Sequence, residues 1–287
     1  MVEIYPKISI ITPNYNQVNY IERTILSVIG QNYPNLEYII IDGGSTDGSV
    51  EIIKKYESYL TYWISEPDKG MYDAICKGFN YATGSLFAWI NSDDFYLPYS
   101  FFTVADIFDS FSMVNWLQGS HSHADEQGRI VSNINSRYWT KYDFLCRDFT
   151  VLQQESIFFR SHLWQQYGLS SLNSGLKLAG DFCLWYNFFK SEQLYTTTAP
   201  IGCFRMRSEQ LSVNSWDKYI EEVNAIYDSN KYVKINHFQF YIYCFLNKIK
   251  FFKILKRMQL EVWFKQKFFN GPGTISFNRS KQCFELY

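Results

Sequence analysis

The chain has 287 residues, of which 47% are hydrophobic and 19% charged, so it can bury a large core and is not intrinsically disordered. The net charge of −1 conceals an uneven distribution, because residues 231–287 carry 11 Lys and Arg against two Asp and Glu. The acidic remainder argues against nucleic acid as the principal ligand, and the basic segment predicts a charged partner.

Six scattered cysteines, none of them in a C-x-x-C pair, indicate reduced thiols in a cytoplasmic protein and not a disulfide framework or a zinc site. The opening MVEIYPKISI lacks the basic and apolar regions of a signal peptide, so we expect none. No apolar run reaches the roughly 18 residues that a membrane span requires.

The first hundred residues alternate between strand-like and helix-like patterns. The strand-like runs are KISIIT (7–12), LEYIIID (36–42), LTYWIS (60–65) and SLFAWIN (85–91). Between them lie the helix-like stretches YIERTILSVIGQ, GSVEIIKKYESY and MYDAICKGFNYA. This alternation predicts an α/β fold, with a mostly parallel sheet flanked by helices.

Three of these strands run directly into polar clusters, namely TPNYNQ, DGGSTDGS and NSDD. The carboxyl ends of parallel strands share one edge of the sheet, where ligands gather, so we expect the clusters to form one site. In NSDD, the adjacent acids Asp93 and Asp94 repel each other and require either water or a bound cation.

From residue 111 onward the pattern is less regular. Short strands are expected around NWLQGSH and GRIVSN, and a helix over residues 161–167. A helix should begin near Asp181, followed by a returning strand pair in YTTTAPIGCFRM. Residues 216–230 and 238–269 are expected to be helical.

Several segments, taken in order, resemble the inverting family 2 glycosyltransferases of the GT-A fold, most closely the bacterial enzymes that build surface polysaccharides. The resemblance covers residues 7 to about 110 and resumes at VLQQESIFFR, AGDFCLW and CFRMRSEQLS. It implies a catalytic domain over residues 1–215, with a nucleotide-sugar half (1–110) and an acceptor half (111–215). Residues 216–287 would form a helical, basic and aromatic C-terminal segment.

On the donor side, the resemblance places NSDD at the family's D-x-D motif, so Asp93 and Asp94 would face a divalent cation, Mn²⁺ or Mg²⁺. Asn91 replaces the first acid of that motif. Asp42 would contact the uracil of a UDP-sugar, and Arg207, in place of a metal-binding histidine, would clamp the diphosphate, with or without Arg205. Lys69 is either a phosphate contact or a solvated lysine. The donor-site residues implied in this way are Pro13, Tyr15, Asp42, Lys69, Asp73, Asp93 and Arg207.

On the acceptor side, the resemblance implies that Asp181 is the base that takes the proton of the acceptor hydroxyl. The start of a helix favours its ionised form, and an unperturbed Asp with a pKa of about 3.9 would be a weak base. Asp181 could equally cap that helix. Family members often have Glu or another residue where this chain has Gly180, and a second acid where it has Cys183. Gln154 and Glu155 would line the acceptor side or hold a strand end.

In the C-terminal segment, a helical stripe is formed by Phe251, Ile254, Leu255, Met258 and Val262. The surrounding lysines predict an interfacial helix at a membrane surface, although the same stripe could pack on the protein.

The sequence therefore predicts a metal-dependent, inverting transferase that moves a sugar from a UDP-sugar to a lipid-linked glycan. The expected location is the cytoplasm, at the inner face of the cell membrane. Two alternatives stay open. One is a nucleotidyltransferase, although this chain lacks the basic, glycine-rich triphosphate loop that such an enzyme requires near its N-terminus. The other is a non-catalytic sugar-nucleotide or glycan-binding scaffold.

Overall fold

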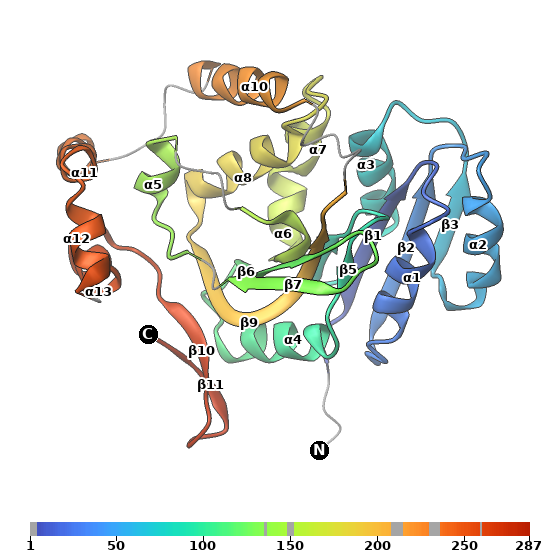
Figure 1. Cartoon of the computed structure of the whole chain (residues 1–287), viewed down its shortest axis with the longest axis horizontal. Coiled ribbons are helices and arrows are strands. Elements are labelled where there is room, and N and C mark those ends of the chain that lie inside the picture. The colour runs from blue at the N-terminus through green and yellow to red at the C-terminus, as the bar shows by residue number, and fades with distance from the viewer. Residues whose placement is uncertain (1–4, 135–136, 148–151, 208–214, 230–235, 259) are drawn as a thin grey trace.

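The computed structural model describes residues 5–134, 137–147, 152–207, 215–229, 236–258 and 260–287. Residues 8–89 form the predicted alternation of strands and helices (Figure 1). In chain order the elements are β1 (Ile8–Asn14), α1 (Ile21–Ile29), β2 (Leu36–Asp42), α2 (Ser49–Lys55), η1 (Glu57–Tyr59), β3 (Tyr62–Ser65), α3 (Met71–Tyr81) and β4 (Leu86–Trp89).

These elements form for the reasons that the sequence pattern indicates. All seven residues of β1 are buried, as expected for a parallel strand covered by helices on both faces. Helix α1 buries Ile21, Thr24, Ile25 and Val28, which recur at the spacing of one helical face. That face packs in the same apolar cluster as alternate residues of the central strands.

The chain continues through a second group of elements. They are β5 (Phe95–Tyr96), α4 (Ser100–Ser110), β6 (Trp116–Ala124), β7 (Ile130–Ile134), α5 (Lys141–Leu145), η2 (Gln154–Ser156), β8 (Ile157–Arg160), α6 (Ser161–Leu163), the π-helical turn η3 (Trp164–Gly168), α7 (Leu169–Leu172), α8 (Gly180–Ser191) and β9 (Leu194–Arg205). The predicted strand pair in YTTTAPIGCFRM is wrong, because this stretch is one long, bent strand, β9. Pro200 lies where the pairing of β9 with β6 changes register, and it makes the sequence resemble a turn.

The strands form one sheet in the order β11-β10-β9-β6-β8-β4-β1-β2-β3, with β5 paired to β9 and β7 to β6. Strands β4, β1, β2 and β3 are mutually parallel. Strand β8 runs antiparallel to both β4 and β6, so the sheet is parallel in its first half and mixed beyond β8. This is the mixed α/β arrangement of the GT-A fold.

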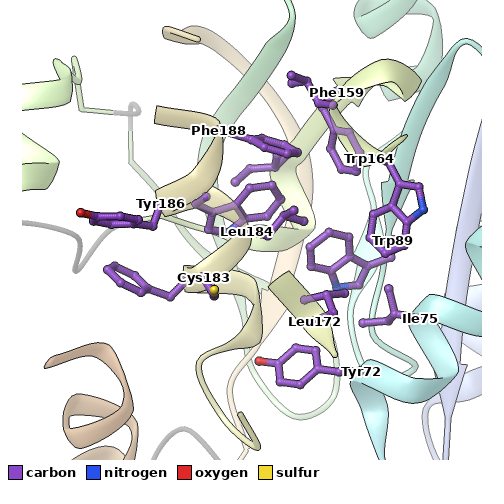
Figure 2. Close-up of a cluster of buried hydrophobic side chains, with 14 of the residues drawn as sticks. Tyr72, Ile75, Trp89, Phe159, Trp164, Leu172, Cys183, Leu184, Tyr186 and Phe188 are labelled. Carbon is purple, nitrogen blue, oxygen red and sulfur yellow. The ribbon is translucent and has the colours of Figure 1, made fainter. Parts of the chain in front are cut away.

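The two faces of the sheet bury two large apolar clusters. In one of them, side chains of α3 and α8 converge on Trp89 and Phe159 (Figure 2). The Trp185 ring stacks on Trp89 with centroids 5.3 Å apart, and on Trp116 with centroids 5.7 Å apart. A large share of the aromatic side chains therefore forms core and not binding surface.

The C-terminal segment contains α10 (Trp216–Ser229), α11 (His237–Lys248), α12 (Phe251–Arg257), α13 (Glu261–Phe269), β10 (Thr274–Asn278) and β11 (Cys283–Leu286). The stretch 238–269, predicted as one helical run, is divided into three helices, with Lys250 in the left-handed region at φ 58°. The β10–β11 hairpin was not predicted, and it joins the main sheet through β9. Within the described residues, no helix has the length and apolar character needed to cross a membrane.

Candidate active site

The polar clusters after β1 and β2 lie side by side, as predicted, because Asn14 and Asp42 end the two strands in register. The Asp42 carboxylate is buried and accepts hydrogen bonds from the Asn14 amide (2.6 Å), the Ser45 hydroxyl (2.5 Å) and the Ser65 hydroxyl (2.6 Å). The backbone N–H groups of Gly44 and Ser45 donate to it as well. Although burial alone would raise the pKa of Asp42, these hydrogen bonds lower it. Asp42 thus holds the DGGS turn in shape.

The predicted turn from Pro13 to Tyr15 lies beside this acid. Pro13 is a buried residue of β1, whereas the Tyr15 ring is 62% exposed just beyond the end of the strand. Of these two predicted residues, only Tyr15 offers a side-chain surface to a ligand.

A second carboxylate, that of Asp68, approaches the DGGS turn from the loop after β3. A Cβ atom at Gly43 would lie only 2.8 Å from an Asp68 carboxylate oxygen, so the glycine leaves room for that acid. The other Asp68 oxygen accepts the Gly70 N–H at 2.7 Å, and burial raises the pKa of Asp68. The Asp73 carboxylate accepts the backbone N–H of Lys69, whose side chain is exposed. Predicted rim residues Lys69 and Asp73 therefore do lie at this edge.

The two acids of NSDD face different ways. The Asp94 side chain is 1% exposed, and its carboxylate accepts the backbone N–H of Arg205 at 2.8 Å. Burial raises the pKa of Asp94 well above its usual range, and the charge of Asp93 raises it further. The Thr24 hydroxyl lies within hydrogen-bonding distance of the Ser92 (3.0 Å) and Asp94 (2.6 Å) carbonyl oxygens and supports the turn from α1. Asp93 is consequently the acid that faces the site.

The two arginines of CFRMR also have separate roles. The Arg207 guanidinium donates a hydrogen bond to the Asp93 carboxylate and lies over the Tyr20 ring, 4.7 Å from its centroid. Arg205 is 2% exposed and donates from Nε to the Asp93 carbonyl (2.6 Å) and from Nη1 to the Glu126 carbonyl (2.9 Å). Arg205, suggested as a second phosphate contact, is instead a buried brace of the NSDD turn.

This turn offers few ligands to a divalent cation. Among the described residues, no group of three or more His, Cys, Asp or Glu side chains is arranged to hold a metal. The side-chain oxygen of Asn91 is buried with no hydrogen-bond partner in the described part of the chain, two residues before Asp93. One carboxylate and one amide oxygen suit Mg²⁺ or Mn²⁺, which complete their coordination with water and substrate phosphates. The residues fit a cation that arrives with a diphosphate.

Asp181 lies in the first turn of α8, where the sequence predicted it. The Tyr72 hydroxyl is 3.2 Å from the Asp181 carboxylate and 2.7 Å from the Leu178 carbonyl oxygen. Burial raises the pKa of Asp181 to about 6, outweighing the hydrogen bonds that lower it. The expectation of an unperturbed, weakly basic carboxylate is therefore wrong. A Cβ at Gly180 would lie 2.8 Å from the Tyr72 ring, which explains the small residue before the acid.

Glu155 lies beneath the site and not on an open acceptor surface. It is 3% exposed, and burial raises its pKa to about 8, with further contributions from the charges of Asp93 and Asp181. Gln154 is also buried, and its side-chain amide donates to the Trp89 carbonyl at the end of β4 (2.6 Å). Gln154 thus ties η2 to β4, the alternative role that the sequence left open.

A family model described as "Glycosyl transferase family 2" matches residues 9–193, well over half of the chain. The chain belongs to this family.

Relatives of this family 2 domain are mostly bacterial. Over 90 residues it is 41% identical to the uncharacterized glycosyltransferase Rv1514c of Mycobacterium tuberculosis (strain H37Rv). The matched stretch covers 31% of this chain and 34% of the relative. Over 231 residues it is 28% identical to an uncharacterized glycosyltransferase of Rickettsia bellii, covering 78% of this chain and 33% of the relative. The putative teichuronic acid biosynthesis glycosyltransferase TuaG of Bacillus subtilis is 39% identical over 94 residues, which cover 31% of this chain and 36% of the relative. The chain spans about a third of the length of these relatives.

Solved structures share the fold. S. aureus TarS 1–349 in complex with UDP-GlcNAc superimposes with a TM-score of 0.61 at 18% identity, covering 77% of this chain and 65% of that one. The mannosyltransferase PcManGT of Pyrobaculum calidifontis, in complex with GDP-Man and Mn²⁺, gives a TM-score of 0.53 at 14% identity, covering 80% and 65%. At these identities the likeness establishes the GT-A fold of the family 2 domain.

Some site residues of this family 2 domain were not found from the sequence. Tyr72 contacts Asp181 across more than a hundred residues, and no local pattern signals the pair. The close approach of Asp68 to Gly43 depends on how two loops meet. The glycine pair in DGGS was the available signal, because a missing side chain marks a place where another group approaches closely.

Proposed function

We propose that this protein transfers a sugar from a UDP-sugar to a glycan acceptor, with inversion at the anomeric carbon, in the synthesis of a bacterial surface polysaccharide. One observation carries the proposal. The charges of Asp93, after β4, and of Asp181, at the start of α8, both raise the pKa of the buried Glu155, so the two acids lie near the same side chain. A candidate diphosphate-side acid and a candidate base thus share one site on a family 2 domain.

The nucleoside of the donor is proposed to bind at the edge formed by β1, β2 and the loop after β3. The exposed Tyr15 ring offers a surface on which a uracil base can stack. Asp42 shapes the turn beneath the base, and a direct bond to the uracil N3–H requires the exchange of one of its present hydrogen bonds. Lys69 and Asp73 complete the same edge. The UDP-GlcNAc bound in the TarS complex supports a uridine donor.

The diphosphate is proposed to bind at Asp93 and Arg207. Arginine presents a planar fork that matches the oxygens of a phosphate, and Arg207 is already placed beside the acid. A divalent cation held by Asp93, with Asp94 behind it, would supply Lewis-acid stabilisation of the departing diphosphate. The Mn²⁺ in the PcManGT complex supports this assignment.

The acceptor hydroxyl is proposed to be activated by Asp181. Its carboxylate takes the hydroxyl proton while the hydroxyl oxygen bonds to the anomeric carbon, and the bond from that carbon to the phosphate oxygen breaks, with the electron pair leaving on UDP. Attack opposite the leaving group inverts the anomeric centre. A pKa of about 6 keeps most of Asp181 ionised at neutral pH and makes it a stronger base than an ordinary Asp.

The acceptor is proposed to be a lipid-linked glycan that enters over residues 111–215, within a catalytic domain of residues 1–215. Buried Glu155 and Gln154 would support the acceptor side from below. The proposed location is the cytoplasmic face of the membrane. The name of TuaG, a putative teichuronic acid biosynthesis enzyme, supports a surface-polysaccharide product.

The test is a calorimetric titration of UDP into the purified chain, with and without Mn²⁺, on the wild type and on Asp93→Ala. Asp125→Ala is a matched control, because Asp125 pairs with the exposed Arg129. Metal-dependent UDP binding, lost only in Asp93→Ala, supports the proposal and leads to a screen of UDP-sugars for transfer. UDP binding that is equal in wild type and Asp93→Ala contradicts the assigned donor site. No binding of UDP under either condition overturns the uridine donor, and GDP is then titrated in the same way.

A further inference from the structure

One face of α11 is apolar and exposed. It consists of Phe238, Tyr241, Ile242, Phe245 and Ile249, the last of which is the C-cap residue of the helix, and we name these residues the α11 face. Phe238, Tyr241 and Phe245 are 74%, 71% and 61% exposed. The spacing of three, four, seven and eleven residues places all five side chains on one stripe of the helix.

The opposite face of α11 is fixed on the catalytic domain. Tyr243 is fully buried, its ring lies 5.5 Å from that of Tyr142 on α5, and its hydroxyl donates to Asp143 at 2.5 Å. Phe240 stacks on Tyr142 as well, with centroids 6.1 Å apart. The buried Lys265 ammonium, from α13, is 3.1 Å from the same Asp143 carboxylate. These contacts fix which side of α11 faces outward.

The helices around the α11 face are basic. Figure 1 shows α11, α12 and α13 stacked at the edge of the molecule opposite α1 and α2. Glu261 is the only acid that the described residues of 236–269 contain, and it pairs with the buried Lys265 at 2.8 Å. The same helices expose further apolar side chains, at Ile254, Met258, Leu260, Trp263 and Phe268. The exposed cations are Lys248, Lys250, Lys253, Lys256, Arg257 and Lys267.

The stripe expected from the sequence is exposed only in part, at Ile254 and Met258. Leu255 is buried in a cluster with Phe252, Tyr243 and Phe269, and Phe251 packs against that cluster. The expected stripe therefore turns partly inward, which is the alternative that the sequence left open. The most exposed apolar side chains of these helices, Phe238, Tyr241 and Phe245, lie one helix earlier, on α11.

We propose that the α11 face, with the cations of α12 and α13 beside it, docks the protein on an anionic lipid bilayer. Aromatic and aliphatic side chains that point outward from a fixed helix can enter the interfacial region, while lysines beside them contact acidic headgroups. Charge favours this occupant over a second copy of the chain, because two copies of such a basic surface would repel each other. The inference does not depend on the transferase activity, since no sugar nucleotide is involved.

The test is co-sedimentation of the full chain with phosphatidylcholine vesicles that either contain or lack phosphatidylglycerol. Wild type should bind the anionic vesicles and bind the neutral ones weakly. The double variant Phe238→Glu/Phe245→Glu should lower the bound fraction on anionic vesicles by roughly tenfold or more, since it removes inserted apolar area and adds repulsion. Lys253→Glu/Lys256→Glu should lower the bound fraction by a similar factor, because it replaces attraction to the acidic headgroups with repulsion and leaves the inserted apolar area unchanged.

Tyr59→Glu is the matched control, because Tyr59 is 63% exposed in η1, far along the chain from α11. It should bind vesicles like wild type. Because the altered side chains are exposed, we expect each variant to retain the fold. Circular dichroism melting verifies this for each variant. Binding that survives both double variants overturns the proposal, as does equal loss in the control. A second copy of the chain would be the occupant if light scattering showed a wild-type dimer that Phe238→Glu/Phe245→Glu dissociates, and if the wild type did not bind vesicles. That result would also overturn the proposal.

Discussion

The Arg207 guanidinium is bound to the Asp93 carboxylate, and the two side chains are only 14% and 15% exposed. In the absence of donor, the charge of the acid that faces the site is thus balanced by the protein itself. A cation or a diphosphate that enters must compete for these groups. The pair therefore connects cation binding with nucleotide binding.

Replacing Arg207 with Gln should separate these two events. Without the guanidinium, Asp93 is left with an unbalanced charge, so we expect Mn²⁺ alone to bind more tightly than to wild type. UDP should bind about tenfold more weakly or worse, because a hydrogen bond to a charged group contributes roughly 1.5–3 kcal/mol. Calorimetric titrations of Mn²⁺ and of UDP measure both effects. Arg129→Gln, at an exposed ion pair, should change neither, and an unaltered Mn²⁺ affinity in Arg207→Gln would contradict the argument.

Asp181 should determine the acidic side of the pH–rate profile. Its pKa of about 6 means that kcat rises with pH through that value and levels off above it, as the carboxylate ionises. Asp181→Asn should retain UDP binding and lose transfer by a factor of roughly 10²–10⁴, the usual contribution of a general base. The measurement is kcat against pH for the wild type, with UDP titrations on both proteins. Transfer by the Asn variant at the wild-type rate would exclude this role.

Tyr72 should influence the reaction through its contact with this acid. Its hydroxyl contacts the Asp181 carboxylate and, like the other hydrogen bonds there, lowers the pKa of that acid. We expect Tyr72→Phe to move the acidic limb of the rate profile to higher pH, with little change in UDP affinity. Tyr62→Phe, on the far edge strand β3, is the control. An acidic limb that stays in place would assign Tyr72 a packing role only.

The site illustrates what a sequence can and cannot reveal. The rim formed by TPNYNQ, DGGS and NSDD was predictable because parallel strands bring their carboxyl ends together. The helix start at Asp181 was predictable from the sequence pattern, whereas the proposed role of this acid came from the family resemblance alone. The different orientations of Asp93 and Asp94 were not, because they depend on Arg205, which lies 111 residues after Asp94 and donates its N–H to it.

The C-terminal segment was less predictable for a related reason. Its helices orient by contacts with α5, such as that between Lys265 and Asp143, which are 122 residues apart in the chain. A periodic stripe indicates that a helix has an apolar face, but not which partner covers it. Lys250 also adopts a left-handed conformation that the local sequence does not signal, and it separates α11 from α12 within the expected helix.

Two buried glutamates should respond to pH with opposite signs. Burial raises the pKa of Glu155 to about 8. As pH rises, this carboxyl therefore ionises in the unfolded chain before it ionises in the folded protein. The stability of the metal-free, donor-free protein consequently falls between about pH 4.5 and pH 8. The Glu37 pKa is lowered, because hydrogen bonds and Lys7 outweigh burial, so its contribution is present above pH 4.5 and is lost in acid. Urea unfolding at pH 3, pH 5 and pH 8 measures both. Glu155→Gln should stabilise the protein at pH 8 and have little effect at pH 5, and Glu37→Gln should destabilise it most at pH 8. The same sign for both variants at pH 8 would refute the assignment.

The ion pair that anchors the C-terminal helices should be costly to break. Asp143 and Lys265 are 2% and 1% exposed, and Asp143 also pairs with Arg137 and accepts from the Tyr243 hydroxyl. Asp143→Asn removes the buried countercharge of the Lys265 ammonium and leaves it paired with the more exposed Glu261, so we expect a loss of about 3–5 kcal/mol in the free energy of unfolding, measured in urea. Asp125→Asn, which breaks the exposed pair with Arg129, should cost less than about 1 kcal/mol. Equal, small losses in both variants would show that the helices are held by apolar packing and not by this buried charge.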